Sequence, residues 1–269
     1  MSVNKNVNIC VVTSPGLLIE INADRASQKA TGLLDRALQH HTSAAPRRLA
    51  PQFVFRALRP HDGHVEHLST AALEAGLGHV RESPQDGGTV ELIVCRPAVD
   101  ERTVLAEGWL GVDAGLGGDT WRARGSTRTA DGSAHLDQQL TVMNSRAALL
   151  VAQDPDRRVL AGDQLYVDLD ISVANLPPGT RLALGSAVIE VTAQPHLGCA
   201  KFSARFGQEA WRFVNSRVGR ALRLRGLNAR IVVSGTVRTR DVVRKLPADG
   251  PAGPGDPAGP ARLRAAARD

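Results

Sequence analysis

Short stretches in which apolar and polar residues alternate dominate the chain from about residue 89 onward. The clearest lie at residues 89–95, 138–143, 165–171, 187–192 and 228–238. Turns rich in glycine and proline separate them, and long helical patterns do not alternate with them. A period of two with frequent turns is typical of strands in a sandwich or barrel. The pattern therefore predicts a mostly β fold with a few short helices.

Two segments show the three-to-four-residue spacing of helices. One begins at Ser69 or Thr70 and places Leu73, Leu77 and Val80 on one face, although glycines at positions 76 and 78 weaken it. The other begins at residue 201 or 203, and its apolar face indicates core packing (Phe206, Ala210, Phe213 and Val214). An apolar helix over residues 147–152 is also predicted, with Asn144 as its N-cap.

The ends of the chain differ from its middle. Residues 1–64 show no convincing globular pattern, and residues 246–269 form a tail rich in Pro, Gly and Ala. We expect a poorly structured N-terminal extension, a folded domain over residues 65–245 and a disordered tail. Because the only methionines are Met1 and Met143, one hypothesis is that translation begins near Val65 from a non-ATG codon. The intact mass of the native protein tests it.

Composition excludes several classes of protein. No apolar stretch approaches the roughly 20 residues that a membrane helix needs, and no signal-peptide pattern is present, so we expect a cytoplasmic protein without a membrane partner. The three cysteines, at positions 10, 95 and 199, lack C-x-x-C spacing. That arrangement suggests neither a disulfide framework nor a zinc site.

Charge is distributed unevenly along the chain. Residues 63–200 hold 10 basic and 18 acidic residues, whereas residues 201–245 hold 12 basic and 2 acidic residues. A basic surface favours an anionic ligand such as a phosphate; alternatively, it is a solvated face paired with the acidic half. Aromatic residues are few and no helix-turn-helix or zinc-finger pattern occurs, so nucleic acid is not an expected partner.

Cys199 is the main candidate for chemistry. It follows a strand that ends at Pro195, comes directly after Gly198, and lies beside Lys201 at the predicted start of a helix. An ammonium group and a helix N-terminus both favour the thiolate, which attacks electrophiles and binds soft metals. The alternative is a buried or idle thiol. Cys95, within a strand pattern, is predicted to be a core cysteine.

A glycine-rich stretch at residues 115–121 is followed by residues 122–129, which concentrate arginine and hydroxyl groups. A phosphate loop requires a following helix, and residues 122–129 are predicted to be loop, so this is not a P-loop. These residues are either donors to an anion or part of a solvated loop.

Several short motifs together resemble a MOSC domain of the small stand-alone bacterial type, the family named after the C-terminal domain of molybdenum cofactor sulfurase. They are Gly-Leu-Gly-Gly-Asp at 115–119, Gly-Asp-Gln-Leu at 162–165, Pro-Pro-Gly-Thr at 177–180, Leu-Gly at 184–185, His-Leu-Gly-Cys-Ala-Lys-Phe at 196–202 and Ala-Arg-Phe-Gly at 204–207. The resemblance covers about residues 110–245, with a lead-in from about residue 65.

The resemblance implies a β-barrel that binds the molybdenum cofactor, a pterin with a phosphate and a dithiolene. It implies that Cys199 either ligates molybdenum or carries sulfur, and thiolate suits such a soft site. The cofactor-binding candidates are Asn144, Arg146, Asp163, Gln164, Lys201, Asn228 and Arg230. Small stand-alone relatives include reductases of N-hydroxylated compounds, in which the cofactor performs the redox chemistry.

The chain also departs from the family pattern. Residues 163–164 are Asp-Gln where many relatives have Glu-Asn, and residues 124–128 replace a His-His-Gly-Gly run of some bacterial relatives. Nothing in the chain supports a pyridoxal-phosphate domain. The sequence thus predicts a reductase of N-hydroxylated small molecules that uses a separate electron-donor protein. The alternatives are a carrier that holds a persulfide on Cys199, served by a sulfur donor protein, and a module that stores or delivers the cofactor.

Overall fold

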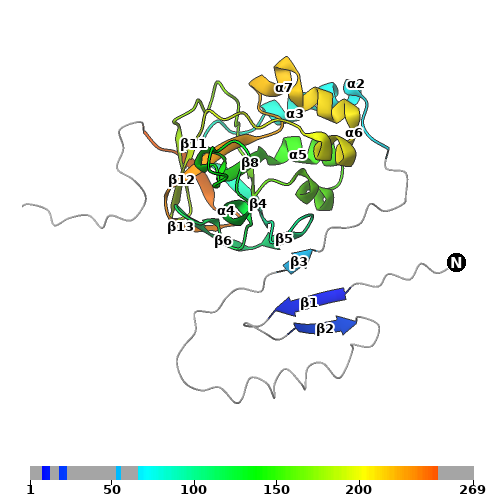
Figure 1. Ribbon diagram of the computed structural model, residues 1–269. Helices are drawn as coiled ribbons and strands as arrows, with labels where there is room; N and C mark the ends of the chain where they lie inside the picture. The colour runs from blue at the N-terminus through cyan, green and yellow to red at the C-terminus, as the bar shows by residue number, and fades with distance from the viewer. Residues whose placement is uncertain (1–7, 13–17, 23–52, 56–65, 248–269) are drawn as a thin grey trace, which may run out of the picture.

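A closed seven-stranded β-barrel forms the body of the molecule (Figure 1). The computed structural model describes residues 8–12, 18–22, 53–55 and 66–247. The barrel strands, in spatial order, are β14 (Val242–Lys245), β10 (Arg181–Leu184), β11 (Ala187–Val191), β12 (Leu227–Val233), β8 (Leu140–Asn144), β9 (Leu165–Asp168) and β4 (Gly88–Cys95). Pairing of β14 with β4 closes the ring. The predicted mostly β fold with a few short helices is confirmed.

Alternation along the strands divides the core into two parts. Ile93, Leu165 and Val167 face the barrel interior, and their neighbours Val94 and Tyr166 face outward into a second apolar cluster. Since successive side chains of a strand point to opposite faces, a strand buried on both faces reads as apolar throughout. The outward residues pack beneath the helices.

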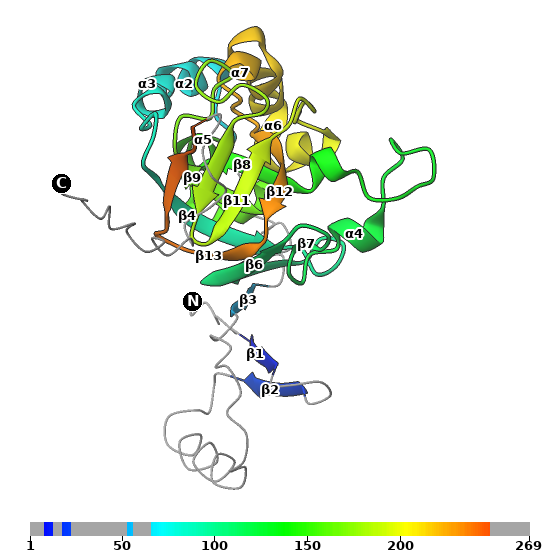
Figure 2. The ribbon, with the colours of Figure 1, turned by 90° about the vertical axis from the view of Figure 1, so that its left-hand side faces the viewer.

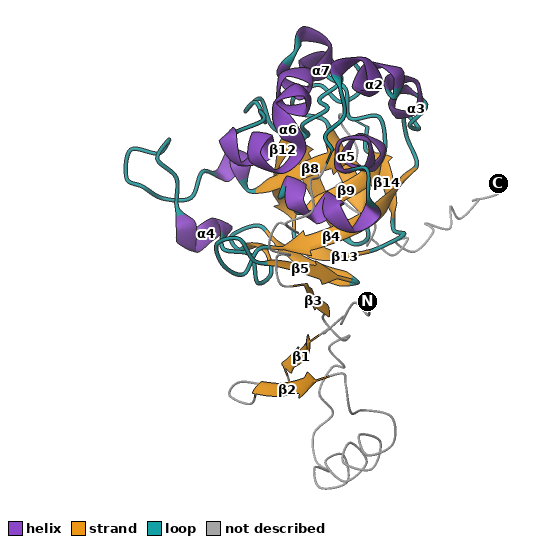
Figure 3. Ribbon diagram, turned by 90° about the vertical axis from the view of Figure 1, so that its right-hand side faces the viewer, coloured by secondary structure: helices purple, strands orange, loops and turns teal. Residues whose placement is uncertain are grey.

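The helices other than the short one at residues 121–124 gather over one end and one side of the barrel (Figure 3). They are α2 (Thr70–Ala75), α3 (Leu77–Arg81), α5 (Ser145–Ala152), α6 (Ala200–Asn215) and α7 (Arg217–Ala221), with the 3-10 helix η3 (Pro155–Ala161) packed against α5 and α6. The single helix predicted from Ser69 is two helices that meet at Gly76, and both bury their apolar residues. Asn144 caps α5 as predicted: its Oδ1 accepts hydrogen bonds from two backbone N–H groups.

A second sheet lies at the other end of the barrel (Figure 2). It consists of β13 (Gly235–Arg238), β6 (Glu107–Gly111) and β7 (Gly115–Leu116). The stretch 101–108 holds β5 (Arg102–Leu105), which pairs with β4, and the start of β6. The predicted loop at residues 122–129 begins with a short helix, α4 (Trp121–Arg124), because Asp119 accepts a hydrogen bond from the Trp121 backbone and Trp121 is buried.

A hairpin at Gly185-Ser186 joins β10 to β11. Gly185 has φ of +59°, and a Cβ there would lie 2.2 Å from the carbonyl oxygen of Thr236. Only glycine therefore meets both the turn geometry and the close approach of the neighbouring chain.

Within the N-terminal 64 residues, three short strands are described. β1 (Asn8–Val12) and β2 (Leu18–Asn22) form an antiparallel hairpin, and β3 (Phe53–Phe55) pairs with β5. The remainder of the predicted extension, Val65 and the tail from residue 248 lie outside the described residues. Within the described part of the chain, no helix is both long and apolar enough to cross a membrane.

Candidate functional site

Cys199 occupies the N-cap position of α6, with an extended backbone (φ −103°, ψ 178°). Its carbonyl oxygen accepts the first hydrogen bond of the helix from Ser203 N, at 3.1 Å, and the residue is exposed. The predicted placement of a thiol between a turn and a helix start is therefore confirmed. An exposed thiol at this position can reach a ligand or a partner protein, as a reactive cysteine must.

Cys95 is the contrasting case. It lies at the end of β4, is buried, and has its pKa raised to about 11, mainly by burial and secondarily by the carboxylate of Asp119. It belongs to the barrel-interior cluster. The prediction of a plain core cysteine is confirmed.

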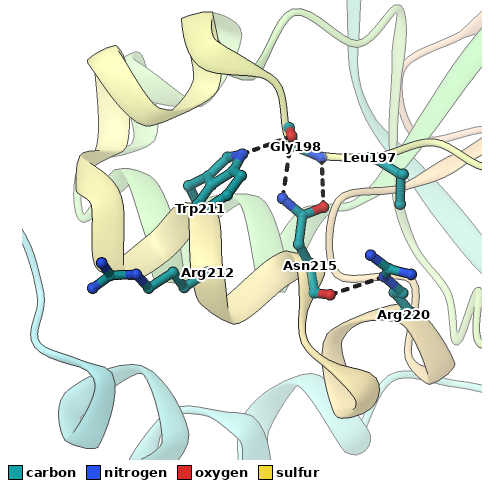
Figure 4. Close-up of a pocket in the computed structure, with 6 residues that line it drawn as sticks. All are labelled: Leu197, Gly198, Trp211, Arg212, Asn215 and Arg220. Carbon is teal, nitrogen blue, oxygen red and sulfur yellow. Dashed lines mark hydrogen bonds between the residues drawn. The ribbon is translucent and has the colours of Figure 1, made fainter.

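The turn that presents Cys199 is fixed by the far end of the same helix (Figure 4). The Gly198 N–H donates to Asn215 Oδ1 at 2.9 Å, and the Gly198 carbonyl accepts from Trp211 Nε1 at 2.8 Å and from Asn215 Nδ2 at 3.1 Å. A Cβ at Gly198 would lie 2.9 Å from Asn215 Nδ2. α6 therefore both begins at Cys199 and holds the backbone just before it.

A cavity of about 380 Å³ lies beside this turn (Figure 4), lined by Leu197, Gly198, Trp211, Arg212, Asn215 and Arg220. Leu197 is 44% exposed, and Arg220 Nε donates to the backbone oxygen of Asn215. Arg212 is already paired with Glu209 at 2.8 Å. The apolar lining and the guanidinium group of Arg220 suit a ligand that combines an apolar body with negative charge.

A buried triad of Asp163, His196 and Arg225 holds the segment that leads to Cys199. Asp163 is fully buried; its Oδ1 lies 2.8 Å from His196 Nε2, and its Oδ2 accepts from Arg225 Nη1 at 2.6 Å. Burial alone would raise the pKa of Asp163, but Arg225 and His196 hold that pKa below its ordinary value. Burial and then the charge of Arg225 lower the pKa of His196. The triad thus ties the residue three positions before Cys199 to the barrel wall.

The turn that carries Asp163 is itself bound by three arginines. Arg205 donates to the carbonyl of residue 160 at 2.8 Å, Arg225 to that of residue 161 at 2.9 Å, and Arg96 to that of residue 162 at 3.0 Å. These arginines come from α6, from the segment before β12 and from the segment after β4. Guanidinium groups from both halves of the sequence therefore converge on one turn next to the Cys199 segment.

Lys201 lies at the edge of this cationic group. Its Nζ is 3.5 Å from Asp100 Oδ1, and Arg205 Nη2 approaches the same oxygen at 3.1 Å. Because Asp100 and Lys201 are both more than half exposed, this contact holds Lys201 only weakly. The ammonium group of Lys201 is therefore largely in solvent.

Three of the predicted cofactor residues are engaged in hydrogen bonds with other parts of the protein. Gln164 Oε1 accepts from the backbone and hydroxyl of Thr141 at 2.8 and 2.6 Å, which joins β8 to β9. Asn144 caps α5, and its Nδ2 donates to Ser83 and to the carbonyl of residue 169. Arg146 makes a paired contact with Asp168 at 2.7 and 2.9 Å.

Two predicted residues on β12 have different surroundings. Asn228 is buried, and its Nδ2 donates to the carbonyl of Gln194 at 3.2 Å, so it anchors the start of the loop that leads to Cys199. Arg230 is on the outer surface and pairs with Glu190 at 2.5 Å. Asn228 thus positions the site from its flank.

Of the predicted residues, the structure brings together Cys199, Lys201 and Asp163. It adds His196 and four arginines that the sequence interpretation did not select (Arg96, Arg102, Arg205 and Arg225). His196 and Arg205 lay within the quoted motifs and could have been chosen from them. Arg96 and Arg102 lie in the acidic half of the sequence, where no local pattern marks them.

No set of three or more His, Cys, Asp or Glu side chains suited to hold a metal ion occurs within the described residues. The groups of this region that could bind a ligand are therefore the Cys199 thiol and the neighbouring cationic side chains.

Comparison with solved structures finds distant similarities. YiiM from Escherichia coli is 19% identical over 59% of this chain and 70% of its own, with a TM-score of 0.40. YuaD from Bacillus subtilis is 13% identical over 58% of this chain and 93% of its own, with a TM-score of 0.41. YiiM from Geobacillus stearothermophilus is 12% identical over 61% of this chain and 75% of its own, with a TM-score of 0.38. No family model and no curated protein matches the chain, so its function is inferred from its own residues.

Proposed function

We propose that this chain is a MOSC-type protein that binds the molybdenum cofactor and reduces N-hydroxylated small molecules with electrons from a separate donor protein. The observation that carries the proposal is the placement of Cys199. Its thiol is exposed at the N-terminus of α6, on a turn tied through His196 to a buried ion-paired triad, beside a group of arginines.

The residues of this region fit such a cofactor in two respects. A thiolate is a soft ligand, and molybdenum bound to a dithiolene is a soft site. The surrounding guanidinium groups suit the phosphate of the pterin. The cofactor supplies the transfer of electrons and oxygen when bound. Asn144 and Gln164 are engaged in the barrel, so we assign them a structural role.

The chain's own contribution is position and charge. Asn215 and Trp211 fix the backbone before Cys199, and the triad fixes His196. A rigid support keeps the thiol in one orientation, which a ligating or nucleophilic group requires. Lys201 and Arg205 place positive charge on the same helix, which favours anionic ligands.

A sulfur carrier is the second candidate. Exposure of the Cys199 thiol, two residues from Lys201, is the observation that favours it, because a persulfide must be reached by both a donor and an acceptor protein. The Cys199 thiolate would then attack the outer sulfur of the donor protein's persulfide, so that the donor S–S bond breaks, the donor leaves as a thiolate and Cys199 becomes the persulfide. Release of that sulfur as sulfide to a metal centre or a cofactor would take two electrons from an external thiol reductant.

Metal and pterin analysis separates these functions. The protein is purified from a host that makes the cofactor, as wild type, as Cys199→Ala and as the matched control Cys95→Ala. The proposal expects about one molybdenum per chain in wild type and in the control, and none in Cys199→Ala. Turnover of N-hydroxylated substrates is expected to follow the metal.

Two results would contradict the reductase. A wild-type protein without molybdenum whose Cys199 carries the mass of one extra sulfur atom indicates the carrier. Bound molybdenum without turnover of any N-hydroxylated compound by an electron donor indicates a storage or delivery module.

A further inference from the structure

Arg102 is a buried cation whose hydrogen bonds are incomplete. The residue is only 9% exposed and lies at the start of β5. Its Nη1 donates to the carbonyl of Glu101 at 2.5 Å, but its buried Nε has no hydrogen-bond partner among the described residues. A buried charge without a partner is costly, so such groups are normally paired with an opposite charge or a ligand.

The neighbours of Arg102 increase this cost. Burial lowers the pKa of Arg102, and the charges of Arg205 and Arg96 lower it further. Asp100 acts in the opposite direction, but it is exposed and already contacts Lys201 and Arg205.

The other arginines of the group each have a carboxylate. Arg96 pairs with Asp119, Arg225 with Asp163 and Arg205 with Asp100. Arg102 makes no ion pair with any described residue. The group therefore holds one positive charge more than its ion pairs neutralise, and that charge lies next to other cations.

A bare glycine faces two of these guanidinium groups. Gly162 has φ of +88°, and a Cβ there would lie 3.4 Å from Arg102 Nη2 and 3.8 Å from Arg205 Nη1. Near the guanidinium groups of Arg102 and Arg205, Gly162 thus presents its backbone and no side chain. Close approach of a ligand to a backbone is a common reason for glycine at such a position.

We propose that Arg102, Arg205 and the bare face of Gly162 form a binding site for a phosphate group. A guanidinium fork matches two oxygens of a phosphate, and a doubly charged phosphate satisfies the unpaired Arg102 as well as the excess charge. Gly162 is adjacent to Asp163 in the sequence, and Arg205 lies on the helix that begins at Cys199. This inference rests on the proposed function, which identifies the phosphate as that of the pterin cofactor.

Phosphate binding is measured on full-length protein made without the cofactor, by thermal unfolding with inorganic phosphate or chloride at equal ionic strength. At about 100 times its dissociation constant, phosphate is expected to raise the wild-type midpoint by roughly 5–10 °C relative to chloride. Absence of a phosphate-specific rise in wild type overturns the proposal, whatever the variants do.

Arg102→Gln is the test variant, and Arg238→Gln is the matched control, since Arg238 is an exposed arginine paired with Glu107 on the second sheet. Arg102→Gln is expected to unfold at the wild-type temperature or above it in chloride, because it removes an unpaired buried charge, and to lose the phosphate shift. Arg238→Gln is expected to keep the shift. An equal shift in Arg102→Gln and wild type overturns the proposal.

Cofactor loading separates this inference from the proposed function. In the cofactor-producing host, Arg102→Gln is expected to contain at most about a tenth of the wild-type pterin. Wild-type loading in Arg102→Gln, with Cys199→Ala empty, overturns the phosphate site and leaves the proposed function standing. The opposite result is a wild-type protein that binds phosphate through Arg102 but never contains the cofactor. It would confirm the phosphate site, overturn the proposed function and show that the phosphate comes from another ligand.

Discussion

Cys95 and Cys199, the two cysteines within residues 66–247, have opposite environments, and this difference decides which of them can react. Cys199 is exposed at a helix start, whereas Cys95 is buried with a pKa of about 11. Since the thiolate is the reactive form, a buried thiol with a raised pKa is doubly protected. Chemistry at a cysteine of the barrel domain therefore belongs to Cys199.

Thiol labelling tests this assignment. In a Cys10→Ser background, iodoacetamide at pH 8 is expected to modify one cysteine per native chain, at Cys199. Adding Cys199→Ser should abolish the fast reaction, and adding Cys95→Ser should leave it unchanged, with the modified residue identified by peptide mass. Fast modification of Cys95 in the folded protein would contradict the burial described above.

Acid sensitivity follows from the triad. His196 has a lowered pKa, so it stays neutral in the folded state at a pH where the unfolded chain binds a proton. The unfolded state then binds more protons, and stability falls as the pH drops below about 6.5. Asp163, whose pKa is also lowered, adds a further loss at pH values below about 4.

The free energy of unfolding, measured in urea between pH 7.5 and 5, is therefore expected to decrease with pH in wild type. His196→Gln should flatten this dependence, although it lowers stability overall by about 1–3 kcal/mol because it weakens a buried hydrogen bond to a charged group. His79→Gln, which changes an exposed histidine, is the control and should keep the wild-type slope. A slope unaffected by His196→Gln would show that this residue does not titrate as described.

At the scale of elements, α6 is the part on which the site depends. It begins at Cys199, supplies Lys201 and Arg205, and returns Trp211 and Asn215 to the turn at Gly198. It is also kinked: Gly207 has φ of 89° and ψ of 160°, which interrupts the helix. A Cβ at Gly207 would lie 2.7 Å from the ring of His67.

Gly207→Ala should therefore destabilise the protein by about 1–3 kcal/mol, because alanine is strained at this backbone conformation and collides with His67. Gly78→Ala is the matched control: Gly78 lies in α3 with open space around its Cα, and the change should stabilise by about 0.5–1 kcal/mol. Urea unfolding measures both. A stabilising Gly207→Ala would mean that α6 is straight in solution.

At the scale of the whole molecule, closure of the barrel sets the boundary of the stable unit. The pairing of β4 with β14 and both apolar clusters lie within residues 66–247. A closed barrel has no free edge, so its stability does not require a further strand. β3, which pairs with β5 outside the ring, adds to it from the edge.

A protein that comprises residues 66–247 alone is therefore expected to unfold cooperatively, with a midpoint within about 3 °C of the full chain. Circular dichroism during heating measures both proteins. A truncated protein that is unfolded or that melts gradually would show that the N-terminal residues form part of the core.

The sequence by itself determined the strands, the turns and the helix caps, because each of these depends on interactions between residues close together in the chain. Alternation predicted β4, β9 and β11, since each strand residue is directed to one face by the backbone alone. The cap at Asn144 and the position of Cys199 at a helix start each depend on a few neighbouring residues, and the structure confirms both.

Only the tertiary structure decided the composition of the site. His196 and Arg225 meet Asp163 across 33 and 62 residues, and such contacts have no periodic signature in the chain. The same holds for Arg102, whose unpaired charge appears only once segments distant in the sequence have buried it. The alternation of apolar and polar residues and the residue types of turns can be read from the local sequence. Burial and the pairing of charges depend on which distant segments the fold brings together.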